Sequence, residues 1–315
     1  MSVQAFDLQG HRGARGHAPE NSLPGWLKAL EMGVGTIECD LGITRDGVVV
    51  VHHDLWLNPN TTRDEKGLWL ENRGPAIHDL SFQELQRYDI GRLKPGSDYA
   101  RSFAGQQAVD GTRIPKLSDL FELLKKPAHA HVRLDCETKV DPTEPSATLE
   151  PGAFARKVIQ EVRQQGMARR MMIQSFDWRT LMVVQQEAPE IATLYLTSPR
   201  TLSKGPQGQP SPWLAGFDID HHGGSVAKAV HAAGGRLWAP NQTYVTAARV
   251  AEAHALGLSV IPWTVNDPAL IARLIDMGVD GIISDYPDRV QVEQKRRIGA
   301  SKPENKLSNE AVQAQ

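Results

Sequence analysis

The sequence has few cysteines, no large excess of either charge and no long apolar run. Two cysteines among 315 residues are too few for a disulfide framework. Cys39 and Cys136 each stand within an apolar stretch typical of a buried strand, so we expect both to be reduced. The formal net charge of -2 gives no electrostatic reason to expect a nucleic-acid partner. No apolar stretch approaches the roughly 18 residues that span a bilayer, so we expect no stable membrane insertion.

A secretory signal is also missing from the start of the sequence. Met1 to Gly10 contains no basic segment followed by an apolar one. We therefore expect a cytoplasmic location, while a periplasmic one stays open for a sequence that begins at a trimmed N-terminus. Nothing in the sequence indicates an oligomeric state.

The sequence does contain a recurring unit of helix, glycine and strand. Ala29 to Gly33 ends a helical stretch and leads into the apolar run Thr36 to Leu41. Near the other end, Leu274 to Gly278 leads into Gly281 to Ser284 in the same way. A glycine at this position favours a left-handed helix C-cap. Helices that alternate with short buried strands predict a parallel sheet.

The strand candidates number one more than the eight places of a TIM (β/α)8 barrel, which is the fold we predict. They are Phe6 to Gln9, Thr36 to Leu41, His131 to Thr138, Arg170 to Ser175, Ile191 to Leu196, Gly216 to Ile219, Arg236 to Ala239, Leu258 to Trp263 and Gly281 to Ser284. Gly216 to Ile219 is the weakest, because loop residues flank it on both sides. Val48 to His53 follows the turn Arg45-Asp46-Gly47 and is interpreted as a hairpin extension of the second strand.

The chain length and composition fit one barrel domain. With 40% hydrophobic and 23% charged residues, the chain has the composition of a globular protein. We predict a single domain over residues 1–298, with an insertion at about 55–115 after the second strand. In that insertion Ser81 is the one good helix N-cap, before Phe82 to Tyr88. The polar residues 299–315 are expected to form a flexible tail.

Two predicted strands carry acids where a barrel strand is normally apolar. In Ile37-Glu38-Cys39-Asp40-Leu41 a period of two places both carboxylates on one face. In Leu134-Asp135-Cys136-Glu137-Thr138-Lys139 the face opposite the apolar residues is also charged. Buried like charges are costly unless a cation or a counter-charge compensates them.

This pattern predicts a metal site made by Glu38, Asp40 and Glu137. Carboxylate oxygens favour a hard divalent cation such as Mg²⁺ or Ca²⁺, whereas zinc would more often recruit His and Cys. Active sites of parallel barrels are built at the carboxyl ends of the strands, where these residues lie. A structural network of strand-end carboxylates is the alternative. Asp135 lies deeper in its strand and is interpreted as structural.

Two histidines belong to the same predicted mouth of the barrel. His11 follows the first strand and stands beside Arg12, and His53 ends the hairpin strand beside Asp54. An adjacent acid can orient an imidazole, so these two are our candidate proton-transfer groups. His52 should face away from His53 by strand alternation.

In chain order, the motifs are His11-Arg12-Gly13 with Pro19-Glu20-Asn21-Ser22, Glu38-x-Asp40, His53-Asp54, Glu137-x-Lys139, Trp263-Thr264-Val265-Asn266, and Asp280-Gly281-Ile282-Ile283-Ser284-Asp285-Tyr286-Pro287. Together they resemble the glycerophosphodiester phosphodiesterases, a family of TIM-barrel enzymes that includes bacterial members. The resemblance spans most of the chain. Single elements such as Trp-Thr-Val-Asn are weak, and their order and spacing carry the assignment.

The resemblance implies metal-dependent hydrolysis of a glycerophosphodiester to sn-glycerol 3-phosphate and an alcohol. One divalent cation, Mg²⁺ or Ca²⁺ with Mn²⁺ as an alternative, would bind to Glu38, Asp40 and Glu137. His11 and His53 would be the general acid and base, in an order that stays open. The 2-hydroxyl of the substrate would attack phosphorus, and water would then open the resulting cyclic phosphate.

The same resemblance implies roles for three further residues. Arg12 and Lys139 would bind the phosphate, although each could also form a salt bridge with a neighbouring acid. Trp263 would line the pocket near the glycerol, with core packing as the alternative. The preferred head group is left open.

Other functions remain as alternatives. A phosphodiesterase acting on lysophospholipids or other phosphodiesters is one, but no amphipathic basic helix supports membrane engagement. An amidohydrolase-type barrel would need paired histidines on the first strand, where this chain has only His11. The retained acids and histidines disfavour a barrel that binds a ligand without catalysis.

Overall fold

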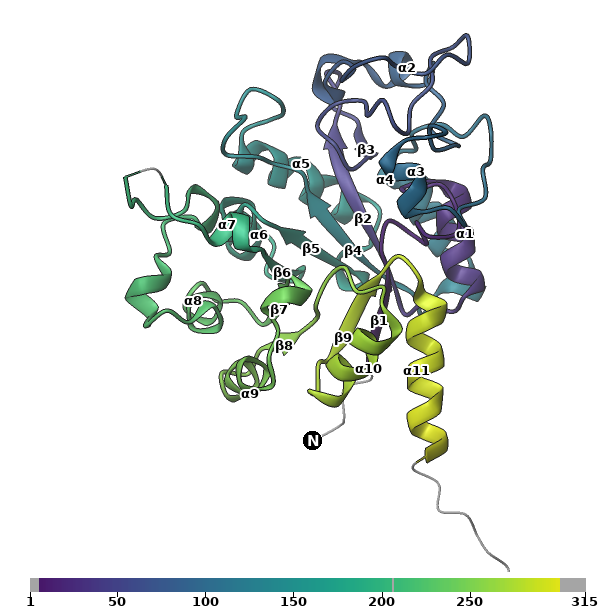
Figure 1. Ribbon diagram of the computed structural model, residues 1–315. Helices are drawn as coiled ribbons and strands as arrows, with labels where there is room; N and C mark the ends of the chain where they lie inside the picture. Colours follow the sequence, from purple (N-terminus) through teal and green to yellow (C-terminus); the bar gives the residue numbers. More distant parts are fainter. Residues whose placement is uncertain (1–5, 206, 301–315) are drawn as a thin grey trace, which may run out of the picture.

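A computed structural model describes residues 6–205 and 207–300 and confirms the predicted TIM barrel (Figure 1). The barrel strands are β1 (Asp7–Gly10), β2 (Thr36–Ile43), β4 (Arg133–Thr138), β5 (Met171–Ser175), β6 (Ala192–Thr197), β7 (Leu237–Pro240), β8 (Ser259–Val260) and β9 (Gly281–Ser284). They pair in parallel in the order β8-β7-β6-β5-β4-β2-β1-β9. The backbone N–H of Asp280 donates to Val260 at 2.9 Å and that of Ile283 to Pro262 at 3.0 Å, and these bonds join the two ends of the sheet.

The structure confirms the predicted strands with one exception, the candidate that was weakest in the sequence. Gly216 to Ile219 is not a strand: the chain turns at Gly216 with a φ of 88° and enters the 3-10 helix η5 (Ile219–His222), which the Asp218 side chain caps. Val48 to His53 yields the short strand β3 (Val49–Val51), which pairs with β2 in the antiparallel direction. The hairpin extension is therefore confirmed, and the barrel keeps eight parallel strands.

Helices surround the strands on the outside of the barrel (Figure 1). They are α1 (Leu23–Glu31), α4 (Leu117–Leu124), α5 (Pro151–Gln164), α6 (Trp178–Glu187), α8 (Val226–Ala232), α9 (Ala247–Ala255), α10 (Pro268–Asp276) and α11 (Pro287–Ala300), while the short helix α7 (Pro199–Leu202) lies in the loop after β6. The helix α11 includes residues 299 and 300, which the sequence placed in the tail, and residues 301–315 lie outside the described part of the chain. None of the helices within residues 6–205 and 207–300 combines the length and apolar character of a membrane span.

The main hydrophobic core lies between the strands and the outer helices. Trp26, Trp178 and Trp238 are fully buried there, together with the outward-facing sides of β2 and β4. Cys39 and Cys136 belong to this layer, and their free thiols lie 3.2 Å apart. Strand alternation thus works as predicted, because the apolar partners of the acids face the helices.

The inside of the barrel is divided into an apolar part and a charged part. A small cluster of buried apolar side chains, contributed mainly by β6 to β9, fills one part: Leu194, Leu196, Ala239, Ile261 and Ile283. Buried acids on β2 and β4 occupy the other: Glu38, Asp40, Asp135 and Glu137. A TIM-barrel interior is normally packed with branched apolar residues, so the charged part is where function is expected.

The insertion follows β3 in the chain and lies beyond the carboxyl end of β2, at the top of Figure 1. It contains η1 (Ile77–Asp79), α2 (Phe82–Leu85) and α3 (Asp98–Ser102), and packs on its own apolar cluster of Val50, Leu57, Ile77, Leu85, Ile90 and Ile114. Ser81 and Glu84 form a capping box at α2, as the N-cap prediction requires. The helix ends at Leu85, earlier than expected.

Candidate active site

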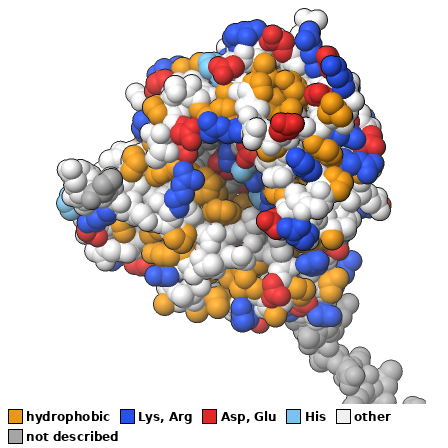
Figure 2. Space-filling model, turned by 45° about the horizontal axis from the view of Figure 1, so that its top comes forward, with side chains coloured by type: hydrophobic (Ala, Val, Ile, Leu, Met, Phe, Trp, Pro, Cys, Tyr) orange, Lys and Arg blue, Asp and Glu red, His pale blue; other side chains and the backbone are white. Residues whose placement is uncertain are grey.

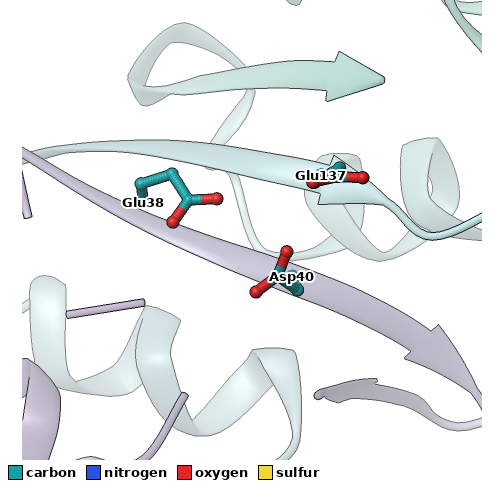
Figure 3. Close-up of side chains that lie close together, drawn as sticks. All are labelled: Glu38, Asp40 and Glu137. Atoms are coloured by element: carbon teal, nitrogen blue, oxygen red, sulfur yellow. The ribbon is translucent and has the colours of Figure 1, made fainter. Parts of the chain in front are cut away.

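Parallel pairing of β2 with β4 brings the three predicted metal ligands together. Asp40 stands directly opposite Glu137 in the sheet, and Glu38 precedes Asp40 by two residues on the same face. One carboxylate oxygen from each of the three lies within 4.8 Å of the others (Figure 3). All three side chains are buried, with exposed fractions of 2%, 1% and 7% for Glu38, Asp40 and Glu137.

Neighbouring donors hold Glu38 and Asp40 in place. The backbone N–H of Arg12 donates to Glu38 Oε2 at 2.8 Å, and Gln174 Nε2 donates to Glu38 Oε1 at 2.7 Å. Asn21 Nδ2 donates to Asp40 Oδ2 at 2.8 Å. Asp40 Oδ1 is buried and accepts no hydrogen bond from the described residues. A buried carboxylate oxygen without a hydrogen bond is costly, and a cation ligated by it would reduce that cost.

The acids differ in how well the protein compensates their charge. Burial raises the pKa of Glu38 well above its usual range, and the neighbouring Asp40 adds to the shift. Burial also raises the pKa of Glu137 to about 7, although Lys139 opposes the shift. Burial acts the same way on Asp40, but His53, Lys139 and Arg12 outweigh it and lower the pKa of that carboxyl. The protein's own cations thus compensate only part of the cluster, and an all-oxygen donor set fits Mg²⁺ or Ca²⁺.

His11 is oriented by a carboxylate from the last strand of the barrel. Its Nδ1 lies 2.7 Å from Asp285 Oδ1, just after β9, and its Nε2 lies 3.9 Å from Glu38 Oε2. Asp285 in turn accepts from Arg15 Nε at 2.7 Å and from Asn266 Nδ2 at 2.7 Å. A carboxylate on Nδ1 fixes the proton there and leaves Nε2 for chemistry at the acid cluster.

His53 repeats this arrangement at the end of the hairpin strand. Its Nδ1 lies 2.6 Å from Asp54 Oδ1, and Asn58 Nδ2 donates to the other oxygen of Asp54 at 2.7 Å.

Burial lowers the pKa of His53 to about 4, with Arg12 and Lys139 adding to the shift. Burial also lowers the pKa of His11, against the pull of Asp285. His52 contacts the backbone of Trp56 instead, so the two neighbouring histidines do face different ways.

Both predicted phosphate-binding cations lie against the acid cluster. Arg12 Nε is 3.3 Å from Asp40 Oδ2, and Lys139 Nζ is 2.8 Å from Glu137 Oε1 and 3.7 Å from Asp40 Oδ1. The salt bridges that the sequence left as alternatives are therefore present. Arg12 also has a φ of 51°, a left-handed conformation that is uncommon for a residue with a side chain and clusters at functional sites.

A tyrosine makes one of the contacts between the insertion and this site. The hydroxyl of Tyr99, on α3, contacts Glu20 and also accepts from Arg12 Nη1 at 3.3 Å and Arg15 Nη1 at 3.1 Å. Glu20 forms a 2.7 Å ion pair with Arg12. The insertion therefore helps to position the arginine beside Asp40 and the arginine that holds Asp285.

A cavity of about 710 Å³ opens beside the acid cluster. Its lining includes His53, Glu137 and Lys139 together with Trp263, whose ring packs edge to face on Phe176 at 5.2 Å between centroids. Figure 2 looks onto this face, where acidic, basic and histidine side chains gather around a central hollow. Trp263 thus lines a cavity instead of lying wholly in the core.

Several residues of the site were not assigned by sequence reasoning. Asp285 belongs to one of the sequence motifs, but it is 274 residues from His11 in the chain, so its contact with that histidine was not predicted. Gln174 on β5 faces Glu38 only because β5 is the next strand after β4. Glu38, Asp40, Glu137 and both histidines, by contrast, meet at one mouth as expected.

The fold and site can be compared with those of known proteins. The profile of the Glycerophosphoryl diester phosphodiesterase family matches residues 11–289. The glycerophosphodiester phosphodiesterase of Caldanaerobacter subterraneus is 27% identical over 280 residues, covering 88% of this chain and 93% of that protein. The enzyme of the same name from Bacillus subtilis is 28% identical over 284 residues, covering 88% and 83%.

Solved structures agree with these sequence matches. A Silicibacter pomeroyi protein, assigned by name to the glycerophosphoryl diester phosphodiesterases, is 36% identical with a TM-score of 0.82, covering 93% of this chain and 94% of that one. A phosphodiesterase from Oleispira antarctica, solved with the product sn-glycerol 3-phosphate, shares the fold at 23% identity with a TM-score of 0.64, covering 92% and 96%.

Proposed function

The chain belongs to the glycerophosphoryl diester phosphodiesterase family, and from that premise we propose that it hydrolyses glycerophosphodiesters to sn-glycerol 3-phosphate and an alcohol with the help of one divalent cation. The observation that carries this proposal is the meeting of three buried carboxylates with two carboxylate-oriented histidines at one barrel mouth. Such a cluster is expensive to maintain without a catalytic or binding role.

Glu38, Asp40 and Glu137 would hold the cation. Their convergent oxygens, the lack of a hydrogen bond to Asp40 Oδ1 and the raised pKa of Glu137 all support this assignment. A bound divalent cation supplies a Lewis acid that polarises a phosphoryl oxygen and favours the deprotonated form of an attacking hydroxyl. Mg²⁺ and Ca²⁺ suit the donors best, and Mn²⁺ also accepts oxygen ligands.

Arg12 and Lys139 would bind the substrate phosphate. Arg12 is buried and Lys139 is largely buried beside the acids, so their charges are less screened than in water. The planar guanidinium of Arg12 can bind two phosphate oxygens, and the ammonium of Lys139 acts as a point charge. Trp263 would contact the glycerol half from the cavity wall.

His11 and His53 would exchange protons with the substrate. One imidazole takes the proton of the attacking hydroxyl at Nε2, and the other donates a proton to the oxygen of the departing alcohol. Asp285 and Asp54 hold the rings so that Nε2 is the free nitrogen in each case. We leave open which histidine has which role.

The attacking group is proposed to be the 2-hydroxyl of the substrate. Its oxygen forms a bond to phosphorus while the bond from phosphorus to the head-group oxygen breaks, giving a cyclic phosphate and the alcohol. Water then adds to phosphorus and opens the ring, leaving glycerol 3-phosphate. The histidines then exchange roles: the one that took the hydroxyl proton returns it to the ring oxygen that leaves phosphorus, and the other takes a proton from the water.

The proposal is tested by enzymatic assay of glycerol 3-phosphate released from glycerophosphoglycerol. An analogue without the 2-hydroxyl in either glycerol half is the matched control, with the released phosphomonoester measured by chromatography, since the cyclic route predicts that it is not cleaved. Cleavage of the analogue at a comparable rate would refute the cyclic intermediate. Cleavage of lysophosphatidylcholine in preference to glycerophosphoglycerol would support the lysophospholipid alternative instead.

A further inference from the structure

We propose that the outer part of the cavity is a head-group subsite selective for anionic head groups, with Arg73 and Arg200 as the residues that set this preference. The inference rests on the proposed function, because the inner end of the cavity is the site of phosphodiester cleavage. The outer wall is made mainly by loops of the insertion and by α7 and η4 (Pro212–Leu214), with Asp141 contributed by the loop after β4.

The charged residues of the outer wall leave a net positive charge. After His53, Asp54, Glu137 and Lys139 are set aside as part of the catalytic site, the cavity lining contains three charged side chains: Arg73, Arg200 and Asp141. Two positive charges and one negative charge sum to +1 for this part of the lining. The cavity volume of about 710 Å³ is ample for a head group as large as a phosphorylated cyclitol.

The acceptors of this wall are already used. Asp141 Oδ1 accepts from the backbone N–H and the hydroxyl of Thr143 at 2.8 and 2.6 Å, and its Oδ2 accepts from Arg200 Nη2 at 3.0 Å. Asp54, in the adjoining catalytic part of the lining, is likewise held by His53 and Asn58. A cationic head group would therefore find no free carboxylate among the described lining residues of the outer cavity.

The donors of this wall are largely available. Arg73 makes no hydrogen bond to the part of the chain that the structure describes, and its Nη1 lies 3.9 Å from Glu144 Oε2. Arg200 donates only to Asp141 among the described residues. The two side chains are 63% and 69% exposed, so a ligand can reach their N–H groups. A guanidinium with free N–H groups suits a phosphate or a carboxylate.

The aromatic rings of the same wall also disfavour a cation. The Arg73 guanidinium lies 4.0 Å from the ring centre of Trp56, and that of Arg200 lies 5.2 Å from the ring centre of Trp213. Quaternary ammonium groups are recognised by free aromatic faces. Here a guanidinium already occupies one face of each ring, and its charge repels a second cation. Stacking also holds the two guanidiniums in a defined orientation.

The test compares three substrates with the same glycerol phosphate half: glycerophosphocholine, glycerophosphoinositol and glycerophosphoinositol 4-phosphate. The inositol pair has the same ring and differs in one phosphate, so its kcat/KM ratio reports charge selectivity alone. We expect wild-type enzyme to prefer the phosphorylated member by about tenfold, a typical effect of one charge-assisted contact. Glycerophosphocholine should be the poorest of the three.

Arg73→Gln and Arg200→Gln should each reduce that ratio several-fold, and the double variant should bring it close to one. Arg200→Gln also frees Asp141 Oδ2, so it should improve glycerophosphocholine relative to glycerophosphoinositol. Arg156→Gln is the matched control, because Arg156 is 59% exposed and pairs with Glu187 on the outside of the barrel. It should leave the ratio unchanged.

Two results would overturn the subsite. One is a wild-type enzyme that cleaves all three substrates without preferring the phosphorylated one, and the other is a double variant with an unchanged ratio. Either result leaves the proposed function standing. Absence of glycerol 3-phosphate from all three substrates would instead refute the proposed function, and the subsite with it.

Discussion

The inner and outer walls of the cavity are built in different ways. The inner wall adjoins the acids of β2 and β4, which are almost completely buried and are held by neighbouring segments, as Glu38 is by the Arg12 backbone and Gln174. The outer wall consists of loop residues such as Arg73 and Arg200, which are mostly exposed. A strand-built wall places charges precisely enough for bond cleavage, whereas a loop-built wall can vary without disturbing it. We infer that residues of the inner wall carry out the reaction and that residues of the outer wall determine which head group is preferred.

The largest expected effect comes from substituting the acids that share one face of β4, of which we assign only one to catalysis. Glu137→Gln should reduce turnover by about 10,000-fold, because several kcal/mol of electrostatic stabilisation disappear with a cation ligand. Asp135→Asn, two residues earlier, should retain most of the activity. The measurement is kcat for glycerophosphoglycerol with each purified variant, and comparable losses in both would contradict the assignment.

The structural role of Asp135 can be tested separately by measuring the thermal stability of Asp135→Asn. Burial raises the pKa of Asp135 well above its usual range, and Asp7 adds to the shift. A carboxyl with a raised folded-state pKa favours the folded state only below its unfolded pKa, about 3.9, and this contribution is lost as the pH rises. The unfolding temperature of Asp135→Asn should therefore exceed that of wild type by more at about pH 8 than at about pH 5. An equal difference at both values would show that the carboxyl is not strained by burial.

The next largest effect is expected at the two histidines. His11→Ala and His53→Ala should each lower kcat about 1,000-fold while the fold is kept, because each removes a proton-transfer group. Circular dichroism of the variants provides the control for folding. Near-normal turnover in either variant would remove that histidine from the reaction.

A substrate with a better leaving group should separate the two roles. Glycerophospho-p-nitrophenol needs little protonation of its leaving oxygen, so it should restore much of the activity of the variant that lacks the general acid. The variant that lacks the general base should stay inactive. Equal rescue of both variants would contradict a division of acid and base between His11 and His53.

A smaller effect is expected at Asp285, which contacts His11 and does not itself line the cavity. Asp285→Asn should lower kcat about 10- to 100-fold with little change in KM, because the ring loses its preferred tautomer and orientation. Asp288→Asn is the matched control, since Asp288 pairs with His17 at 2.9 Å outside the acid cluster. A loss confined to KM would point to a merely structural role for Asp285.

The smallest effect tests whether the insertion supports the inner wall. Tyr99→Phe removes the hydroxyl that joins Glu20, Arg12 and Arg15. We expect kcat/KM to fall about fivefold, because Arg12 is then less firmly oriented. Tyr88→Phe, also in the insertion, should have no comparable effect. Equal kcat/KM values for Tyr99→Phe and Tyr88→Phe would show that the Tyr99 hydroxyl does not support the inner wall.

The parts of the fold and site that followed from sequence share one property: their evidence is local. Two acids at a spacing of two in β2 announce a charged strand face, and this face is what the structure contains. The loop residues around Gly216 likewise marked Gly216 to Ile219 as the weakest strand candidate, and the structure has no strand there. Such patterns can be recognised within a few residues, without knowledge of the tertiary structure.

The parts that did not follow from sequence depend on contacts between distant segments. Asp285 reaches His11 only because β9 pairs with β1 when the barrel closes. Arg73 and Arg200 line one cavity although a whole series of strands and helices separates them in the chain. Neither residue stands in a motif, since surface arginines on loops are common. Their significance comes from the tryptophans and acids beside them, which only the folded chain brings together.

The central claim is that Glu38, Asp40 and Glu137 bind a divalent cation on which hydrolysis depends. The most direct test counts Mn²⁺ bound to EDTA-stripped enzyme by electron paramagnetic resonance while turnover is measured in the same samples. We predict one tightly bound ion per chain, turnover that rises in proportion to it, and loss of both in Glu137→Gln. Full turnover in stripped enzyme, or an undiminished ion in Glu137→Gln, would contradict the claim.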